Sequence, residues 1–208
     1  MKLKRKDCLI CDRATKKYLN ICDSCYSILV PKKEGIVKNF KFVDRAYACF
    51  YYNPLFRDIL RRYKFGNQRY LYRLFSEILL EKIMDLKLYE EIDLIMPVPL
   101  HRDTLIKRGF NQVDLLAEEI GKILKVEVLT RTLVKNKFTE EQVKLNLEER
   151  KVNLKDAFDI KNPEKIEDKR ILLIDDIITT GSTLEECSKV LKEFGSGKII
   201  GLSIGTTS

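Results

Sequence analysis

Four cysteines near the N-terminus have the spacing of a metal site. They form two Cys-x-x-Cys pairs, Cys8 with Cys11 and Cys22 with Cys25, separated by ten residues. Two such pairs place four thiolates at the corners of a tetrahedron, the geometry that zinc accepts, and four protein ligands leave no open position for catalysis. We therefore expect a structural zinc ion. Two disulfides, unrelated core thiols or an iron–sulfur cluster are the alternatives.

The cysteine module is too short to fold by apolar burial alone. A segment of about 25 residues buries little surface, so metal binding would supply its stability. Cys49 and Cys187 have no companion at metal spacing and are expected to be buried apolar fillers. Basic residues around the paired cysteines either contact nucleic acid or form a solvated face: Lys4, Arg5, Lys6, Arg13, Lys16 and Lys17.

Two adjacent carboxylates precede a hydroxyl-rich turn. Asp175 and Asp176 follow the apolar run Ile171–Ile174, and we expect them just past the end of a buried strand, where open α/β sheets bind ligands. There they can accept hydrogen bonds from vicinal sugar hydroxyls. The turn offers hydroxyls and backbone N–H groups to a phosphate at a helix N-terminus. An acidic cap before an ordinary helix is the alternative. The residues of the turn are Thr179, Thr180, Gly181, Ser182 and Thr183.

Cations alternate with aromatic side chains between residues 57 and 73. This interleaving is typical of surfaces that bind single-stranded nucleic acid, because bases stack on the rings while cations contact the phosphates. In the alternative, Tyr63 and Phe65 belong to the core and the arginines are solvated. The cationic candidates for nucleic-acid contact are Arg57, Arg61, Arg62 and Lys64.

The overall composition is basic. Lys and Arg together number 39 against 31 Asp and Glu, which gives a formal charge of +8 and suits a protein that meets phosphate groups on a ligand, a nucleic acid or both. The apolar runs are much shorter than the roughly 20 residues of a membrane span. Asp7 and Cys8 stand where the apolar region of a signal peptide would begin. We therefore expect a cytoplasmic protein without a membrane span, with reduced cysteines unless a metal holds them.

A framework of alternating strands and helices must position these residues. We place a metal module at 1–32 and an α/β domain with a mostly parallel sheet at 33–208. The polar segment 135–153 has no apolar period and is expected to be a mobile hood over an active site. The expected strands are 43–51, 92–98, 126–134, 170–174 and 198–203, and the expected helices are 54–64, 70–86, 113–124 and 184–194.

The segment 171–183 resembles the signature with which type I phosphoribosyltransferases bind 5-phosphoribosyl-1-diphosphate (PRPP). The resemblance implies that Asp175 and Asp176 hold the ribose 2′- and 3′-hydroxyls, that the turn 179–183 cradles the 5′-phosphate, and that Mg²⁺ accompanies PRPP. It implies a type I phosphoribosyltransferase-like parallel sheet flanked by helices, with the small four-cysteine zinc module at the N-terminus. Thr179 stands where 6-oxopurine enzymes carry an aspartate, so hypoxanthine or guanine salvage is disfavoured.

A basic segment after the strand that ends at Pro97 corresponds to the loop that grips pyrophosphate in type I enzymes. Charged donors suit this role because they form strong hydrogen bonds to phosphate oxygens. His101 is the only histidine, and a satisfied surface or core imidazole is its alternative role. The candidates for pyrophosphate contact are His101, Arg102, Lys107 and Arg108.

The order of motifs over nearly the whole chain resembles the competence protein F (ComF or ComFC) family. The matching motifs are the paired cysteines, Tyr63–Gly66, Pro97–Leu100, Arg108–Gln112, the residues Thr139, Gln142, Leu145, Arg150 and Asn153 before Ala157-Phe158, and the PRPP segment. The resemblance implies a PRPP-binding protein of natural competence, the uptake of single-stranded DNA, with other DNA-uptake proteins as partners.

Two functions are compatible with these observations, and the cations and aromatic residues between 57 and 73 support the second of them. The first is a Mg²⁺-dependent phosphoribosyltransferase whose acceptor and general base are unidentified. The second is a non-catalytic adaptor for single-stranded DNA that uses the fold to bind a ligand or a 5′-phosphate. Cations of the hood are candidates for closing over the ligand, with solvated surface as their alternative role: Lys135, Lys137, Lys144 and Arg150.

Overall fold

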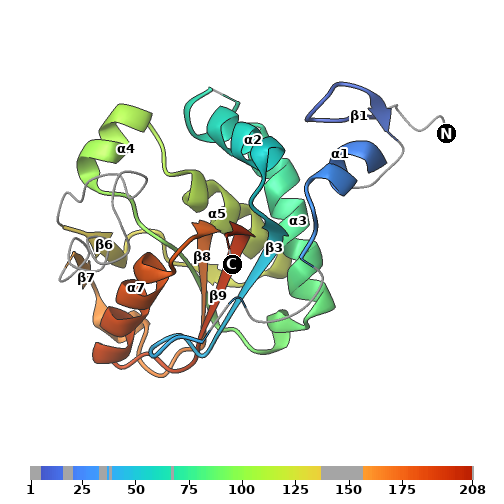
Figure 1. Ribbon diagram of the computed structural model, residues 1–208. Helices are drawn as coiled ribbons and strands as arrows, with labels where there is room; N and C mark the ends of the chain where they lie inside the picture. Colours follow the sequence, from blue (N-terminus) through green and yellow to red (C-terminus); the bar gives the residue numbers. More distant parts are fainter. Residues whose placement is uncertain are drawn as a thin grey trace.

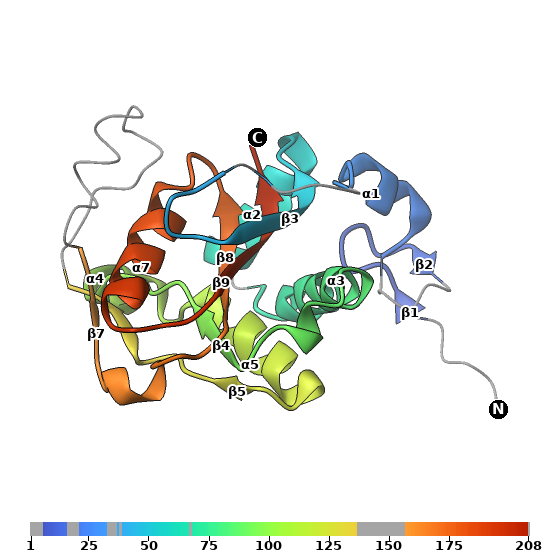
Figure 2. The same cartoon turned by 90° about the horizontal axis from the view of Figure 1, so that it is seen from below.

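The computed structural model describes residues 6–15, 21–32, 37, 39–66, 68–136 and 157–207. Its main sheet has five parallel strands in the order β3-β9-β8-β4-β5 (Figures 1 and 2). This arrangement confirms the predicted parallel α/β sheet. The strands are β3 (Arg45–Tyr51), β4 (Leu94–Pro97), β5 (Glu127–Val128), β8 (Ile171–Ile178) and β9 (Ile199–Thr206).

Both faces of the central strand β8 are covered, which explains its continuous apolar run. Because side chains alternate along a strand, Leu172 and Ile174 face one core cluster and Ile171 and Leu173 face the other. Figure 1 and Figure 2 show helices on both sides of the sheet. The first cluster is covered by α2 (Pro54–Phe65), α3 (Leu71–Asp85) and α5 (Gln112–Leu124), and the second by α7 (Ser182–Glu193) with the hairpin β6 (Leu133–Lys135) and β7 (Phe158–Ile160).

The cysteine module packs against the α2 and α3 side of the domain. It consists of the antiparallel pair β1 (Lys6–Asp7) and β2 (Ala14–Thr15), followed by α1 (Asp23–Ile28). Cys8, Ile21 and Leu29 are fully buried in the same core cluster as residues of α2 and α3. The module and the sheet therefore share one core. The division at residues 32 and 33 stays a prediction.

The helices begin and end where their local sequence directs. Asn53 caps α2 by accepting a hydrogen bond from Phe56 N at 2.9 Å, and Pro54 occupies the first helical position. Asn111 caps α5 in the same way, through Val113 N at 3.2 Å. Two short 3₁₀ helices lie in connections, Leu88–Glu90 between α3 and β4 and Pro163–Lys165 between β7 and β8.

The predicted strand 126–134 was wrong. The chain forms the short β5 in the main sheet, turns at residues 130–132, and continues as β6, which pairs antiparallel with β7 in a separate sheet. Lys161 N donates to Thr132 O at 2.7 Å. After the turn, the chain therefore pairs with the segment around β7 instead of with β4. The helix α4 (Arg102–Arg108) was not predicted and stands where we expected a loop.

Strand β8 is longer than predicted, and this corrects the position of the two carboxylates. The pairing of β8 with β4 ends at Ile174, opposite Pro97, whereas its pairing with β9 continues to Ile178. Asp175 and Asp176 therefore lie within the strand, at the point where it has lost one neighbour. Of the predicted hood, only Lys135 and Asn136 are described; Lys137, Lys144 and Arg150 lie outside the described residues.

Helix α7 lies close to the sheet because β9 carries a glycine beneath it. A Cβ at Gly201 would come within 2.6 Å of a methyl group of Leu184, in the first turn of α7. Within the part of the chain that the structure describes, no helix is both long enough and apolar enough to cross a membrane.

Candidate functional site

The two carboxylates of β8 point to opposite faces of the sheet. Strand alternation places Asp176 on the same face as Leu172 and Ile174, beneath α2 and α5, and Asp175 on the face covered by α7 and β6. Asp176 is only 5% exposed, and Asp175 is half-buried. Each carboxylate therefore meets a different set of neighbours.

Asp176 accepts contacts from two different helices at one oxygen. Lys64 Nζ at the end of α2 lies 2.7 Å from Oδ2, and Gln112 Nε2 at the start of α5 donates a hydrogen bond to the same atom. A buried carboxylate is tolerated when it is paired and hydrogen-bonded in this way. The other carboxylate oxygen, Oδ1, takes part in neither contact and is the one suited to a ligand hydroxyl.

The contacts around Asp176 close into a ring. Gln112 Oε1 accepts a hydrogen bond of 2.6 Å from Arg108 Nη1, and the Arg108 guanidinium lies 4.8 Å from the centre of the Phe65 ring. Phe65 follows Lys64 in sequence, so the ring returns to α2. We name these five residues the Asp176 ring: Lys64, Phe65, Arg108, Gln112 and Asp176.

Tyr63 fixes the end of α2 above this ring. Its hydroxyl donates to the backbone oxygen of Gln112 at 2.6 Å. Its aromatic ring packs against the rings of Phe75 and Phe110, with distances of 5.3 and 6.2 Å between ring centres. Tyr63 is fully buried and belongs to the core, whereas Phe65 is 63% exposed. The backbone that carries Lys64 is thus held by packing on three sides.

Asp175 is a carboxylate with a perturbed protonation equilibrium. Burial, and next the negative charge of Asp176, raise the pKa of Asp175 to about 7. The positive charges of Lys64 and Lys135 oppose this rise. Lys135 lies in β6, and burial lowers its own pKa. The carboxylate pair is thus flanked by a lysine on each face of the sheet.

The hydroxyl-rich turn joins β8 to α7 at the same end of the sheet. Gly181 adopts φ 75°, a left-handed conformation that favours glycine. Thr180 Oγ1 lies 2.9 Å from Ser182 Oγ and accepts a hydrogen bond from Ser182 N at 3.3 Å. These hydrogen bonds fix the shape of the turn at the start of α7, and a helix N-terminus favours an anion.

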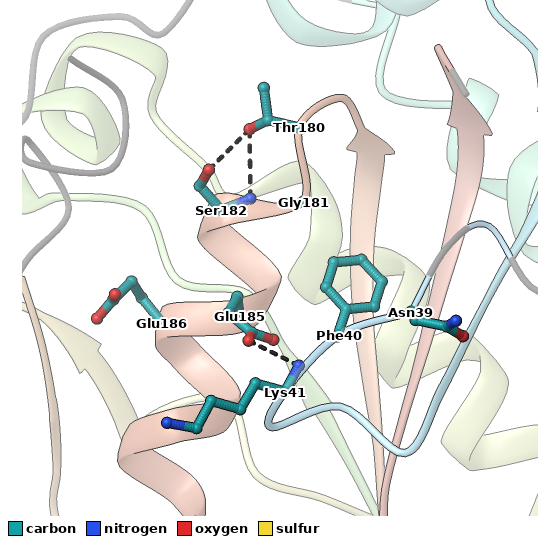
Figure 3. A pocket seen from close by; sticks show the side chains of 8 residues that line it. All are labelled: Asn39, Phe40, Lys41, Thr180, Gly181, Ser182, Glu185 and Glu186. Carbon is teal, nitrogen blue, oxygen red and sulfur yellow. Dashed lines mark hydrogen bonds between the residues drawn. The ribbon is translucent and has the colours of Figure 1, made fainter. Parts of the chain in front are cut away.

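A pocket of about 300 Å³ borders this turn (Figure 3). Its far wall is the segment that precedes β3, held in place because Glu185 accepts hydrogen bonds from Lys41 N at 2.8 Å and Phe42 N at 3.3 Å. Residues 39–42 therefore form one side of this pocket, and the turn with the start of α7 forms the other. The pocket is lined by Asn39, Phe40, Lys41, Thr180, Gly181, Ser182, Glu185 and Glu186.

The basic segment predicted to contact pyrophosphate is mostly helical. His101 caps α4, where its Nδ1 accepts from Asp103 N at 3.2 Å, and Arg102 and Lys107 are exposed on the helix. Arg108 alone of these candidates belongs to the Asp176 ring. Among the described residues, sequence reasoning missed Gln112 as a partner of Asp176, because no spacing pattern links two residues from different elements.

The four candidates for nucleic-acid contact separate on α2. Arg57 and Arg61 are exposed one turn apart, on the outer surface. Arg62 turns toward the cysteine module, where its Nη1 lies 3.4 Å from Ile10 O and its Nε donates to Gln68 Oε1 at 2.8 Å. Lys64 turns toward Asp176.

The four N-terminal cysteines converge. Their Sγ atoms all lie within 4.8 Å of one another, and Cys11 Sγ is 3.7 Å from Cys22 Sγ. A tetrahedron with metal–sulfur bonds of about 2.3 Å has edges of about 3.8 Å, so the cluster has the dimensions of a metal site. All six cysteines are free, and Cys49 and Cys187 are buried elsewhere, as predicted.

Comparison with known proteins gives one family model and relatives named as competence or DNA utilization proteins. A family model described as a phosphoribosyl transferase domain matches residues 104–203. Competence protein F of Haemophilus influenzae is 35% identical over 153 residues, which cover 72% of this chain and 66% of that protein. Competence protein ComFC of Streptococcus pneumoniae is 37% identical over 149 residues, covering 72% and 62%. DNA utilization protein YhgH of Escherichia coli is 27% identical over 200 residues, covering 92% and 86%. The chain thus matches slightly less than two thirds of the length of competence protein F and of ComFC.

The raised pKa of Asp175 predicts a specific pH dependence of stability. Between its unfolded pKa of about 3.9 and its folded pKa of about 7, the folded state binds more protons, so the stabilisation is complete below about pH 4 and is lost as the pH rises to about 7. Asp175→Asn lacks this loss. We expect the variant to gain on the order of 1–3 kcal/mol over wild type between pH 5 and pH 7.5, measured by urea unfolding. Parallel pH profiles for the two proteins would contradict this assignment.

Proposed function

This chain belongs to the competence protein F family, and from that premise we propose that it binds PRPP with Mg²⁺ at the carboxyl end of β8 and acts in DNA uptake. The observation that supports the proposal most is the juxtaposition of two carboxylates and a hydroxyl-rich turn within one strand–turn–helix unit. PRPP has vicinal ribose hydroxyls, a 5′-phosphate and a 1-diphosphate. The carboxylates can accept hydrogen bonds from the hydroxyls, and the turn can donate to the 5′-phosphate.

In the proposed complex, each part of PRPP has candidate partners in the protein. Asp175 and Asp176 accept from the ribose hydroxyls, and the turn Thr179–Thr183 donates to the 5′-phosphate. Mg²⁺ bound with PRPP would neutralise charge on the diphosphate. In the transferase reaction an acceptor forms a bond to the anomeric carbon while the carbon–oxygen bond to the diphosphate breaks, and the electron pair leaves with pyrophosphate. The acceptor is not defined by the described residues. A cytoplasmic location, where PRPP is made, is part of the proposal.

We further propose that the four-cysteine cluster binds a structural zinc ion. Four thiolates of suitable spacing favour zinc, and all four positions are filled by the protein. The ion would tie β1, β2 and α1 together and so hold Ile21 and Leu29 in the shared core.

A second candidate function is binding of single-stranded DNA along α2. Arg57 and Arg61 are exposed on successive turns, and the exposed ring of Phe65 lies one turn further along the same face. This combination of cations and an aromatic ring fits phosphates and stacked bases. The two arginines of this face do not belong to the Asp176 ring, whereas Phe65 belongs to both the DNA-binding face and the ring.

The PRPP site is tested by thermal unfolding with Mg²⁺ and PRPP. At about 100 times its Kd, a ligand that binds only the folded state stabilises it by about 2.7 kcal/mol, which corresponds to a rise in Tm of about 5–10 °C for a chain of this size. We expect this rise in wild type and in the control variant Asp93→Asn. Asp93 lies away from the site, and its Oδ1 is 2.7 Å from Arg170 Nη2. The double variant Asp175→Asn, Asp176→Asn should show none. An equal rise in the double variant, or no rise in wild type, would refute the proposal.

The zinc proposal predicts one zinc ion per chain by elemental analysis. Cys11→Ser should lose the ion, whereas Cys187→Ala, which removes a buried thiol elsewhere, should keep it. Because Cys8 shares its core cluster with α2 and α3, metal removal by a chelator should lower the Tm of the whole chain. Iron with visible absorption would instead indicate a cluster, and the absence of any metal would contradict the proposal.

The DNA proposal predicts a change in salt dependence. Replacing Arg57 and Arg61 with alanine should weaken binding of single-stranded DNA and reduce the slope of log K against log salt by about 1–1.5, since each phosphate contact contributes about 0.7. Arg170→Ala, at an exposed arginine that pairs with Asp93 and lies outside α2, is the control for loss of an arginine elsewhere and should leave the slope unchanged. If both variants change the slope equally, binding is not localised on α2.

A further inference from the structure

Lys64, near the end of α2, reaches the proposed ligand site at the end of β8. Its ammonium contacts Asp176 Oδ2 at 2.7 Å, and 19% of its side chain remains exposed, against 7% for Asp176. An ammonium has three N–H donors, and the contact with Asp176 Oδ2 needs only one of them. The group can therefore serve Asp176 and an anion in the opening at the same time.

The stereochemistry of PRPP indicates which anion this is. The 1-diphosphate of PRPP is in the α configuration, so it projects from the same face of the ribose ring as the 2′- and 3′-hydroxyls. A cation beside the carboxylate that accepts those hydroxyls is consequently beside the diphosphate. The 5′-phosphate, by contrast, extends from the opposite side of the ring toward the turn Thr179–Thr183.

Arg108 provides a second cation at the same place. Its guanidinium reaches Gln112 Oε1 at 2.6 Å, and Gln112 Nε2 reaches the Asp176 oxygen that Lys64 contacts. Lys64 and Arg108 thus lie on either side of one glutamine side chain. Two cations held this way can share the charge of a diphosphate, which a single surface lysine cannot do.

The position of Lys64 is also fixed before any ligand arrives. Tyr63, the preceding residue, is fully buried and hydrogen-bonded to Gln112 O at 2.6 Å, and Phe65, the following residue, stacks on Arg108 at 4.8 Å. Little conformational freedom of the backbone remains to be lost on binding, which favours affinity.

We propose that Lys64 is a ligand-binding residue that bridges Asp176 and the 1-diphosphate of PRPP, with Arg108 as its partner across Gln112. This inference rests on the proposed function, because it assigns one further contact to the same ligand. It assigns Lys64 to the diphosphate rather than to nucleic acid. It also separates two kinds of contact: Lys64 contacts the diphosphate directly, and it affects the ribose only through Asp176.

The test compares two ligands by isothermal titration calorimetry. Mg²⁺-PRPP carries the diphosphate, and ribose 5-phosphate has the same hydroxyls and 5′-phosphate without it. The variants are Lys64→Gln, which keeps a donor for Asp176 without the charge, and Lys64→Arg, which keeps the charge. Lys82→Gln is the matched control, because Lys82 is a half-buried lysine on α3 that donates to Lys32 O at 2.9 Å. Circular dichroism and Tm without ligand show whether each variant is folded.

Lys64→Gln is expected to weaken PRPP binding by roughly 10- to 100-fold, the value of a hydrogen bond to a charged group, and to change ribose 5-phosphate binding by less than about 3-fold. Lys64→Arg should recover part of the PRPP affinity, and Lys82→Gln should bind both ligands as wild type does. An equal loss for both ligands would show that Lys64 acts only through Asp176, and unchanged PRPP binding would remove it from the site; either result overturns the inference. If wild type binds PRPP while Lys64→Gln is unaffected, only this inference fails, whereas a wild type that does not bind PRPP refutes the proposed function itself.

Discussion

The buried carboxylate of Asp176 constrains the arrangement of three elements. A charge that is 5% exposed must be paired, and here the pairing comes from Lys64 on α2 and Gln112 on α5. Removing either partner would leave the carboxylate short of donors in a low-dielectric surrounding. The end of α2, the start of α5 and the open end of β8 are therefore held together by one functional group, which is also the group proposed to accept a ribose hydroxyl.

The same helix end links this site to the cysteine module. Arg62, Tyr63 and Lys64 are consecutive, and they contact respectively Ile10 O in the module, Gln112 O on α5, and Asp176 on β8. Since Cys8, Ile21 and Leu29 belong to the same core cluster as α2, the module supports the helix that carries Lys64. The metal site and the ligand site are in this sense parts of one structure, although they use separate side chains.

The sequence predicted those parts of the site whose chemistry is local. Paired cysteines, adjacent aspartates and a Thr-Thr-Gly-Ser-Thr turn are recognisable because their members are close in the chain, and the parallel sheet followed from the alternation of strands and helices. The partners of Asp176 come from distant elements and leave no spacing signal. The end of β8 was misplaced because the apolar run stops at Ile174, whereas β9 extends the strand to Ile178. The prediction of one strand at 126–134 was wrong because the chain turns at residues 130–132 and continues in a second sheet.

A crystal structure of the protein with Mg²⁺ and PRPP tests the central claim, that the end of β8 and the Asp176 ring form one binding site. The account predicts a ribose hydroxyl on Asp176 Oδ1, the 5′-phosphate in the turn Thr179–Thr183, and a diphosphate oxygen within about 3 Å of Lys64 Nζ. A ligand bound elsewhere, or a Lys64 side chain turned away from the diphosphate, would contradict it.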